Sequence, residues 1–242
     1  MDTVFPALIA RLLPTLPSRC AVCHAWPSEP VCEACVNQFA QPVARCRTCA
    51  LPVYGGAHQC GACVLEPPPL DACVAAVSYD YPWADLISDF KFHGKPGWAH
   101  TLARLLRSAP WVEPALERAD LIIPMPLSHA RLRERGFNQA VELARQLTSV
   151  RKMDATLLLR LKDTTAQVNL NRAERLRNLH NAFAVEPLKA MRLRGARLVL
   201  LDDVMTSGAS LYSAARALRA AGAGHITGMV FARTDAPHTG TD

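Results

Sequence analysis

The sequence lacks any long apolar run, because charged or proline residues interrupt every stretch before 18 consecutive apolar residues are reached. A helix that crosses a membrane needs about 20 such residues, so no membrane span is expected. Charged residues make up only 20% of the 242 residues, and half of the residues are hydrophobic. This composition excludes a disordered chain, a collagen-like repeat and a coiled coil, and the length suits one medium domain with a smaller one.

The N-terminal segment also lacks the pattern of a secretory signal peptide. Asp2 stands where positive charge is usual, and Arg11 interrupts the apolar residues. Those apolar residues recur with helical spacing, so we expect an amphipathic helix over residues 1–19 that docks on the body of the protein. The expected location is cytoplasmic, where thiols stay reduced and cysteine pairs bind metal.

Cysteine is absent after residue 73, and eight of the nine cysteines form four Cys-x2-Cys knuckles separated by 8, 10 and 10 residues. Each knuckle presents two thiolates, and zinc prefers four such ligands in a tetrahedron. We therefore predict two structural Zn²⁺ sites in a double zinc ribbon over residues 20–66, with the pairing of the knuckles left open. The predicted ligands are Cys20, Cys23, Cys32, Cys35, Cys46, Cys49, Cys60 and Cys63. The remaining cysteine, Cys73, is expected to be a buried apolar residue.

Acidic residues are scarce between residues 129 and 197, where 15 Lys and Arg residues stand against 6 Asp and Glu residues. Twelve of these basic residues are Arg, which favours planar contacts with phosphate or carboxylate groups. A phosphorylated ligand or a nucleic acid is therefore the first partner to consider, and a solvated basic face is the alternative. Residues 1–75 carry a net charge of −1, which favours partner docking by the cysteine block over DNA binding.

After residue 73, the hydrophobic pattern alternates between strands and helices. This alternation predicts an α/β domain over residues 74–235 with a mostly parallel sheet. The expected strands are 74–81, 121–125, 156–161, 198–201 and 226–233. The expected helices are 82–92, 97–107, 136–150, 171–180 and 210–221.

The most informative stretch is residues 197–210, in which a buried strand leads to Asp202 and Asp203 and a short turn opens a helix. Ligands bind at the carboxyl ends of parallel strands, and a helix N-terminus offers unpaired N–H groups to a phosphate. The carboxylates suit the vicinal hydroxyls of a ribose. A phosphorylated sugar would suit both the acid pair and the turn at the helix start. The alternative is an ordinary strand-to-helix connection in which serines cap the helix. The predicted phosphate-binding residues are Thr206, Ser207, Gly208, Ala209 and Ser210.

This stretch resembles the 5-phosphoribosyl-1-pyrophosphate (PRPP) loop of type I phosphoribosyltransferases. The resemblance implies that Asp202 and Asp203 are the catalytic residues, which hold the ribose hydroxyls and fix the ring near the positive charge that develops. Ser207 and Ser210 stand where that family usually has threonine, and they keep the hydroxyl group. The resemblance also implies Mg²⁺ as the ion that accompanies PRPP.

Residues 90–94, 123–127, 135–139 and 160–178 resemble the marks of the ComF family, which includes ComFC and GntX-type proteins. With the knuckles, the resemblance runs from about residue 20 to residue 233. It implies a zinc-ribbon N-terminus, a domain of the type I phosphoribosyltransferase kind, and a link to DNA uptake in natural transformation. The expected partners are PRPP and, as further candidates, single-stranded DNA or DNA-uptake proteins.

Pyrophosphate needs cations in addition to Mg²⁺. Residues 162–178 are a candidate for a loop that closes over the reaction centre, and the alternative is that their arginines only solvate a helix or follow a nucleic acid. The sequence indicates no general base, so a non-catalytic PRPP sensor stays open beside a transferase with an undefined acceptor. The candidate pyrophosphate and loop residues are Lys91, Arg135, Arg160, Gln167, Arg172 and Arg175.

Overall fold

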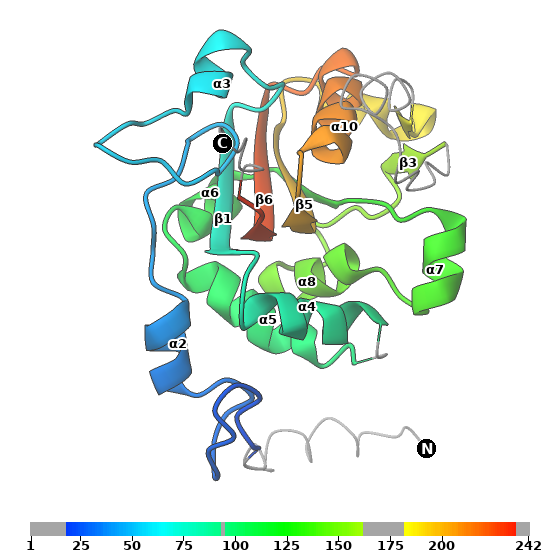
Figure 1. Ribbon diagram of the computed structural model, residues 1–242. Helices are drawn as coiled ribbons and strands as arrows, with labels where there is room; N and C mark the ends of the chain where they lie inside the picture. The colour runs from blue at the N-terminus through cyan, green and yellow to red at the C-terminus, as the bar shows by residue number, and fades with distance from the viewer. Residues whose placement is uncertain (1–17, 93–94, 162–181, 236–242) are drawn as a thin grey trace, which may run out of the picture. The chain divides into compact units, whose positions relative to one another are not determined.

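The computed structural model describes residues 18–92, 95–161 and 182–235 (Figure 1). The chain divides into two compact units, residues 1–41 and 42–242, which are described separately. The helix expected over residues 1–19 falls almost entirely outside the described residues, as does the helix expected over 171–180. Within the described ranges, no helix has both the length and the apolar content to cross a bilayer. The domain boundaries expected from the sequence stay predictions.

The first unit is organised around two cysteine turns and one short helix. Ser18 and Ser28 pair as an antiparallel bridge. Helix α2 (Glu33–Phe39) begins directly after Cys32, and Glu33 in its first turn suits the positive end of the helix dipole. Cys20 and Cys35 are buried, so thiols occupy the interior of this unit where a larger protein would place aliphatic side chains.

The second unit contains a four-stranded parallel sheet with the strand order β1-β6-β5-β2 (Figure 1). Its strands are β1 (Ala72–Ser78), β2 (Leu121–Pro124), β5 (Arg197–Met205) and β6 (His225–Arg233). The two central strands, β5 and β6, are buried along most of their length because both of their faces are covered. The prediction of an α/β fold with a parallel sheet is confirmed.

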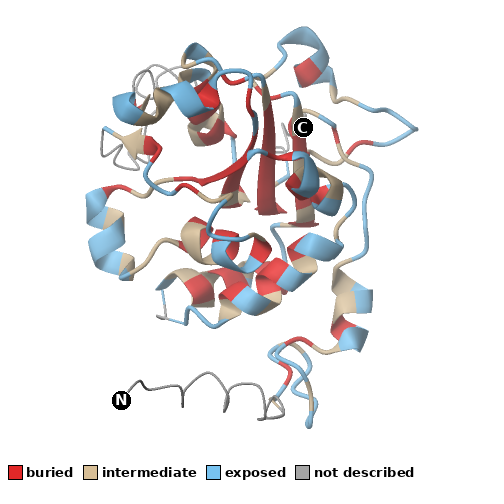
Figure 2. Cartoon of the chain, turned by 180° about the vertical axis from the view of Figure 1, so that it is seen from behind, coloured by how far each residue is buried: buried red, intermediate tan, exposed pale blue. Residues whose placement is uncertain are grey.

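Helices cover both faces of the sheet. Figure 1 shows α4, α5 and α8 on one side of the strands and α10 on the other. Residues of α10 share an apolar cluster with Val230 of β6. The next residue, Phe231, points to the opposite face of the sheet, where its ring packs edge-on against that of Trp83 of α4 with 5.9 Å between the ring centroids. Figure 2 shows the buried residues concentrated in the strands and on the helix sides that face them. The helices are α3 (Gly61–Leu65), α4 (Trp83–Phe92), α5 (Trp98–Ser108), α6 (Val112–Arg118), α7 (His129–Arg135), α8 (Gln139–Leu147) and α10 (Ala209–Ala220).

A second, smaller sheet stands apart from the parallel one. Strand β3 (Leu158–Arg160) pairs antiparallel with β4 (Phe183–Val185), and the 3-10 helix η1 (Pro187–Leu193) follows. The strand expected at 156–161 is therefore present, but it lies outside the parallel sheet. Three residues are too few for an alternation pattern to indicate which strand is the partner.

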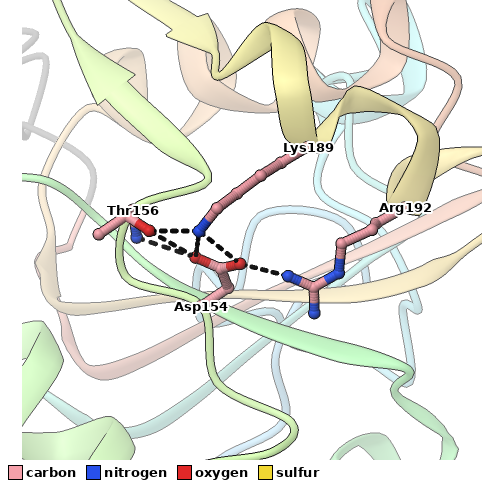
Figure 3. Close-up of polar contacts among 4 residues, drawn as sticks. All are labelled: Asp154, Thr156, Lys189 and Arg192. Atoms are coloured by element: carbon pink, nitrogen blue, oxygen red, sulfur yellow. Dashed lines mark hydrogen bonds and ion pairs between the residues drawn. The ribbon is translucent and has the colours of Figure 1, made fainter.

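Asp154 fixes this small sheet to η1 (Figure 3). Its carboxylate is 8% exposed and accepts hydrogen bonds from Lys189 at 2.8 and 3.0 Å, from Arg192, and from the hydroxyl of Thr156 at 3.0 Å. Burial by itself raises the pKa of Asp154, but the bonds from Lys189 and Thr156 outweigh it and lower the pKa. The cluster thus holds the start of β3, the strand that carries Arg160, against the segment after β4.

The second cysteine group is part of the apolar core of its unit. Cys46, Cys49 and Cys63 are buried in the same cluster as Leu70 and Cys73. Cys73 is buried as expected, and its thiol lies 3.8 Å from the sulfur of Met205. An ion bound by this group would therefore stabilise the core of the α/β unit directly.

Candidate functional site

Two groups of four thiols lie close enough together to hold one metal ion each. The four sulfur atoms in each group lie within 4.8 Å of one another, and the groups are Cys20, Cys23, Cys32, Cys35 and Cys46, Cys49, Cys60, Cys63. Sγ–Sγ distances of 3.6 to 3.8 Å match the separation of about 3.8 Å that sulfurs about 2.3 Å from a tetrahedral zinc ion require. Neighbouring knuckles thus share a site, and each group could bind zinc.

The thiols within each group differ in acidity. Burial raises the pKa of Cys46, but the Thr48 hydroxyl and backbone N–H groups outweigh burial and lower the pKa to about 6. Burial and the neighbouring thiols raise the pKa of Cys35 to about 12. Four adjacent thiolates repel one another unless a cation lies between them, so metal binding would release protons.

The carboxyl ends of β2 and β5 border a cavity of about 380 Å³. Every residue predicted for the sugar-phosphate site that the structure describes lines this cavity. These residues are Lys91, Arg135, Arg160, Asp202, Asp203, Thr206, Ser207, Gly208, Ala209 and Ser210. Gln167, Arg172 and Arg175 lie outside the described residues.

Asp202 and Asp203 lie within β5, which continues to Met205, rather than after the end of the strand. The expected strand end at residue 201 was wrong, because pairing with β6 continues through Asp202, Val204 and Met205 although the two acids interrupt the apolar run.

Consecutive strand residues point to opposite faces, so the two acids meet different surroundings. Asp203 pairs with Lys91 of α4, with 3.2 Å between Nζ and Oδ2. Burial, followed by the charge of Asp203, raises the pKa of Asp202 to about 7. Lys91 and Arg160 oppose this rise only in part. The pair therefore favours a ligand that brings hydroxyl donors or a cation.

The turn after β5 is shaped so that an anion can approach its backbone. Gly208 has φ +79°, and a Cβ atom there would lie 2.6 Å from the side chains of Met205 and Tyr212, so only glycine fits. Helix α10 begins at Ala209, and its first N–H groups lack partners within the helix. Ser207 accepts a hydrogen bond from the N–H of Ala209 at 3.4 Å. Glycine and hydroxyl residues at a helix start are typical of a phosphate site.

Two buried donors beside the cavity have no partner among the described residues, namely Nε of Arg135 and Nε2 of Gln139. Gln139 is 2% exposed, and its side-chain oxygen accepts a hydrogen bond from Arg135 at 3.1 Å. An unsatisfied buried donor costs about 1–3 kcal/mol. The pair therefore favours a ligand rich in acceptor oxygens. The sequence motif at 135–139 contains Gln139, but the reasoning from sequence did not assign it to the site.

Asn138 joins the turn after β2 to helix α8. Its Oδ1 atom accepts from the N–H of Ala140 at 2.9 Å and caps α8, while its Nδ2 atom donates to the carbonyl of Met125 at 2.9 Å. The turn after β2 is thereby held rigidly at the cavity wall. Tyr79 and Arg131 also line the cavity, and the reasoning from sequence missed both because neither belongs to a motif.

Arg233 links the turn after β5 to the second cysteine group. Its side chain is 4% exposed, its Nε atom donates to the carbonyl of Cys49 at 2.9 Å, and Nη1 donates to the carbonyl of Met205 at 3.1 Å. A further bond from Nη1 reaches the carbonyl of Thr206. An isolated arginine at the end of an apolar strand gives no sequence signal, so this link was not predicted.

Comparison with known proteins identifies the relatives of the chain. No family model matches. The chain is 31% identical over 228 residues to the DNA utilization protein YhgH of Salmonella typhimurium, an alignment that covers 91% of this chain and 99% of that protein. It is 34% identical over 205 residues to Competence protein F of Haemophilus influenzae, covering 81% and 87% of the two chains. The chain belongs to the ComF family.

Two partial matches accompany these relatives. Competence protein ComFC of Bacillus subtilis is 30% identical to this ComF-family chain over 149 residues, which is 58% of this chain and 55% of that protein. A solved structure of the allosteric regulatory enzyme of purine biosynthesis overlaps 56% of this chain and 25% of its own, with 18% identity and a TM-score of 0.35. The overlap is weak, and it is the strand pairing that establishes the parallel sheet.

Proposed function

We propose that this ComF-family chain binds PRPP in the cavity beside Asp202 and Asp203. The observation that carries the proposal is that the acid pair, the turn before α10 and the unpartnered donors of Arg135 and Gln139 all line one cavity. A carboxylate pair alone would suit many ligands. Hydroxyl-binding acids, an anion-binding helix start and spare donors together match a phosphorylated ribose with a second anionic group.

Each part of PRPP is assigned to a part of the cavity. The 5-phosphate lies on the turn from Thr206 to Ser210, and the ribose hydroxyls donate to Asp202 and Asp203. The pyrophosphate lies toward Arg135 and Arg160, where guanidinium groups offer bidentate contacts. Mg²⁺ that accompanies PRPP would add positive charge beside the pyrophosphate, next to that of Arg135 and Arg160.

A transfer reaction at this site is a nucleophilic displacement at C1 of the ribose. The acceptor forms a bond to C1 while the bond from C1 to the pyrophosphate oxygen breaks, and pyrophosphate leaves with the electron pair. Asp202 and Asp203 lie near the positive charge that develops on the sugar and stabilise it. The acceptor itself is not defined by the cavity.

A non-catalytic PRPP sensor is the second candidate, and a specific observation favours it. Among the described residues, the cavity lining contains no His, Glu or Cys, and its two carboxylates, Asp202 and Asp203, are assigned to the ribose hydroxyls rather than to a proton on an acceptor. Pyrophosphate release, measured after addition of nucleobases, amines or nucleic acid, separates the two candidates. A transferase releases pyrophosphate from PRPP, whereas a sensor binds PRPP and leaves it intact.

We further propose that the chain serves DNA uptake in the cytoplasm. The support is the names of two relatives, a DNA utilization protein and a competence protein. The two groups of reduced thiols agree with a compartment in which cysteines bind metal. Single-stranded DNA or DNA-uptake proteins are the partners proposed on this basis.

Calorimetric titration of the full zinc-loaded chain with PRPP and Mg²⁺ tests the proposal. We expect saturable binding by the wild type and at least tenfold weaker binding by Asp203→Asn. The control is Glu142→Gln, which removes a charge from the exposed pair with Arg145 on α8 and is expected to bind as the wild type does. Absence of PRPP binding by the folded wild type would overturn the proposal.

A further inference from the structure

A second, larger cavity of about 820 Å³ lies at the other end of the parallel sheet. The first residues of three strands line it, namely Ala72 of β1, Arg197 of β5 and His225 of β6. Within the part of the chain that the structure describes, the two cavities share no lining residue. A ligand in this amino-end groove would therefore leave the proposed PRPP site open.

The floor and walls of the amino-end groove are mainly apolar. The floor is formed by alternate residues of β1, namely Ala72, Val74 and Ala76, which are only half-buried while the residues between them are buried. The segment 110–119, which includes α6, forms one wall, and residues 42–44 form another. Small side chains on the floor leave room for aliphatic groups from a ligand.

Trp111 stands on the α6 wall and is 76% exposed. Its φ angle is +70°, in the left-handed region, which costs a residue with a side chain roughly 1–2 kcal/mol. A large aromatic side chain held in solvent by a strained backbone contributes nothing to the core. Such residues are typical of recognition surfaces.

The polar part of the groove is positively charged. Among the described residues, Arg47, Arg118 and Arg197 form no ion pair, although all three line the groove. Of the carboxylates that the structure describes, Asp71 alone lines the groove, and it is already bound by Arg219 and by the N–H of Ile226 at 2.6 Å. An occupant that complements the groove therefore carries negative charge beside apolar groups.

A peptide could bind here as an added strand at the edge of β1 or as a helix in the groove, and the contacts of β1 favour the second mode. The N–H of Cys73 donates to the carbonyl of Arg47 at 2.6 Å, and Arg45 donates to the hydroxyl of Ser78 at 3.2 Å. The backbone edge of β1 is therefore occupied at Cys73, and the Arg45 side chain lies against Ser78 at the other end of the strand, which disfavours the addition of a further strand. Recognition instead uses side chains laid into the groove, as an amphipathic helix does.

We propose that the amino-end groove binds an acidic amphipathic segment of a partner protein. Aliphatic side chains of that segment lie on the floor formed by β1 and against Trp111, and its carboxylates face Arg118 and Arg197. A single-stranded nucleic acid suits the groove less well, because nucleic acids bind along a charged track with several stacking platforms. Among the described lining residues, Trp111 is the one exposed Trp, Tyr or Phe side chain.

A displayed library of random 14-residue peptides, selected on the full zinc-loaded protein, tests this proposal. We expect the enriched peptides to combine Leu, Ile or Phe at helical spacing with Asp or Glu. Synthetic copies of these peptides, measured by fluorescence anisotropy, should bind Arg118→Glu and Trp111→Ala at least tenfold more weakly than the wild type. Arg133→Glu is the matched control, because Arg133 is exposed on α7 and does not line the groove.

Three results would overturn the proposal. These are a selection without enrichment, enriched peptides that bind Arg118→Glu as tightly as the wild type, and a labelled 15-nucleotide oligo-dT that binds with the same dependence on Arg118 and Trp111 while peptides do not. Both residues are exposed, so folding of the variants is expected and is checked by circular dichroism. PRPP binding by Arg118→Glu is expected to be unchanged, which separates this proposal from that of the PRPP site.

Discussion

The guanidinium Nε atom of Arg233 lies 2.9 Å from the carbonyl oxygen of Cys49 and donates a hydrogen bond to it. The same side chain donates to the carbonyl oxygens of Met205 and Thr206. One buried arginine therefore connects a potential zinc site to the turn that we assign to a phosphate. This contact makes the geometry of the turn dependent on the cysteine group.

Replacement of Arg233 by methionine is expected to lower the free energy of unfolding by about 2–3 kcal/mol, because several buried carbonyl groups lose a charged donor. PRPP binding should weaken as well, since the turn loses its support. Urea unfolding and calorimetry measure the two effects. The control is Arg216→Met, an exposed position on α10, which is expected to change stability by less than about 0.5 kcal/mol. Equal stability of the two variants would contradict the role of Arg233.

Removal of a single thiol should have different consequences in the two cysteine groups. Cys23→Ser and Cys60→Ser are each expected to reduce bound zinc from two ions per chain to one, because each group has four ligands. Only Cys60→Ser should destabilise the α/β unit, because the second group packs within its apolar core. Elemental analysis gives the zinc content, and amide exchange of β5 and β6 reports the stability. Equal protection of these strands in the two variants would argue against this view.

The raised pKa of Asp202 predicts a pH dependence of stability in the ligand-free protein. Between about pH 4 and pH 7 the folded state keeps a proton that the unfolded state has lost, so the free energy of unfolding falls as pH rises through this window. The groups that face Asp202 are Asp203, Lys91 and Arg160. Asp202→Asn should flatten this slope, and urea unfolding at several pH values measures it. Identical slopes for the wild type and the variant would refute the prediction.

Gly208→Ala should lower stability more than the backbone angle alone explains. Gly195→Ala is the matched control, because Gly195 also has positive φ but has open space around it, and its cost should be about 1–2 kcal/mol. At Gly208 the new methyl group also meets Met205 and Tyr212. We expect a larger loss in urea unfolding and loss of PRPP binding for this variant alone. A cost no greater than that of the control would show that the turn has room for a side chain.

Much of the fold follows from local sequence patterns. The strand before Asp202 and the helix after Gly208 were predicted within a few residues, because an apolar run and a glycine-serine turn are strong local signals. The cysteine spacing likewise predicts two four-thiol groups. It does not indicate that neighbouring knuckles share an ion, since that depends on how the chain turns between Cys23 and Cys32.

The contacts that complete the site join residues far apart in the sequence, and local sequence patterns do not predict such contacts. Lys91 of helix α4 reaches Asp203 of strand β5, and Arg233 reaches Cys49 across 184 positions of sequence. Strand β4 is only three residues long and takes its partner from tertiary packing. The cavity residues Tyr79 and Arg131 belong to no motif, and it is the folding of the chain that brings them to the site.

Comparison of two sugar phosphates tests the central claim most directly, because the claim assigns the vicinal hydroxyls of a phosphorylated ribose to Asp202 and Asp203. Calorimetry should show that the wild type binds ribose 5-phosphate about tenfold more tightly than 2-deoxyribose 5-phosphate, since a lost hydrogen bond to a carboxylate costs about 1.5–3 kcal/mol. Asp203→Asn should narrow this difference. Equal affinity of the wild type for the two sugars would contradict the account.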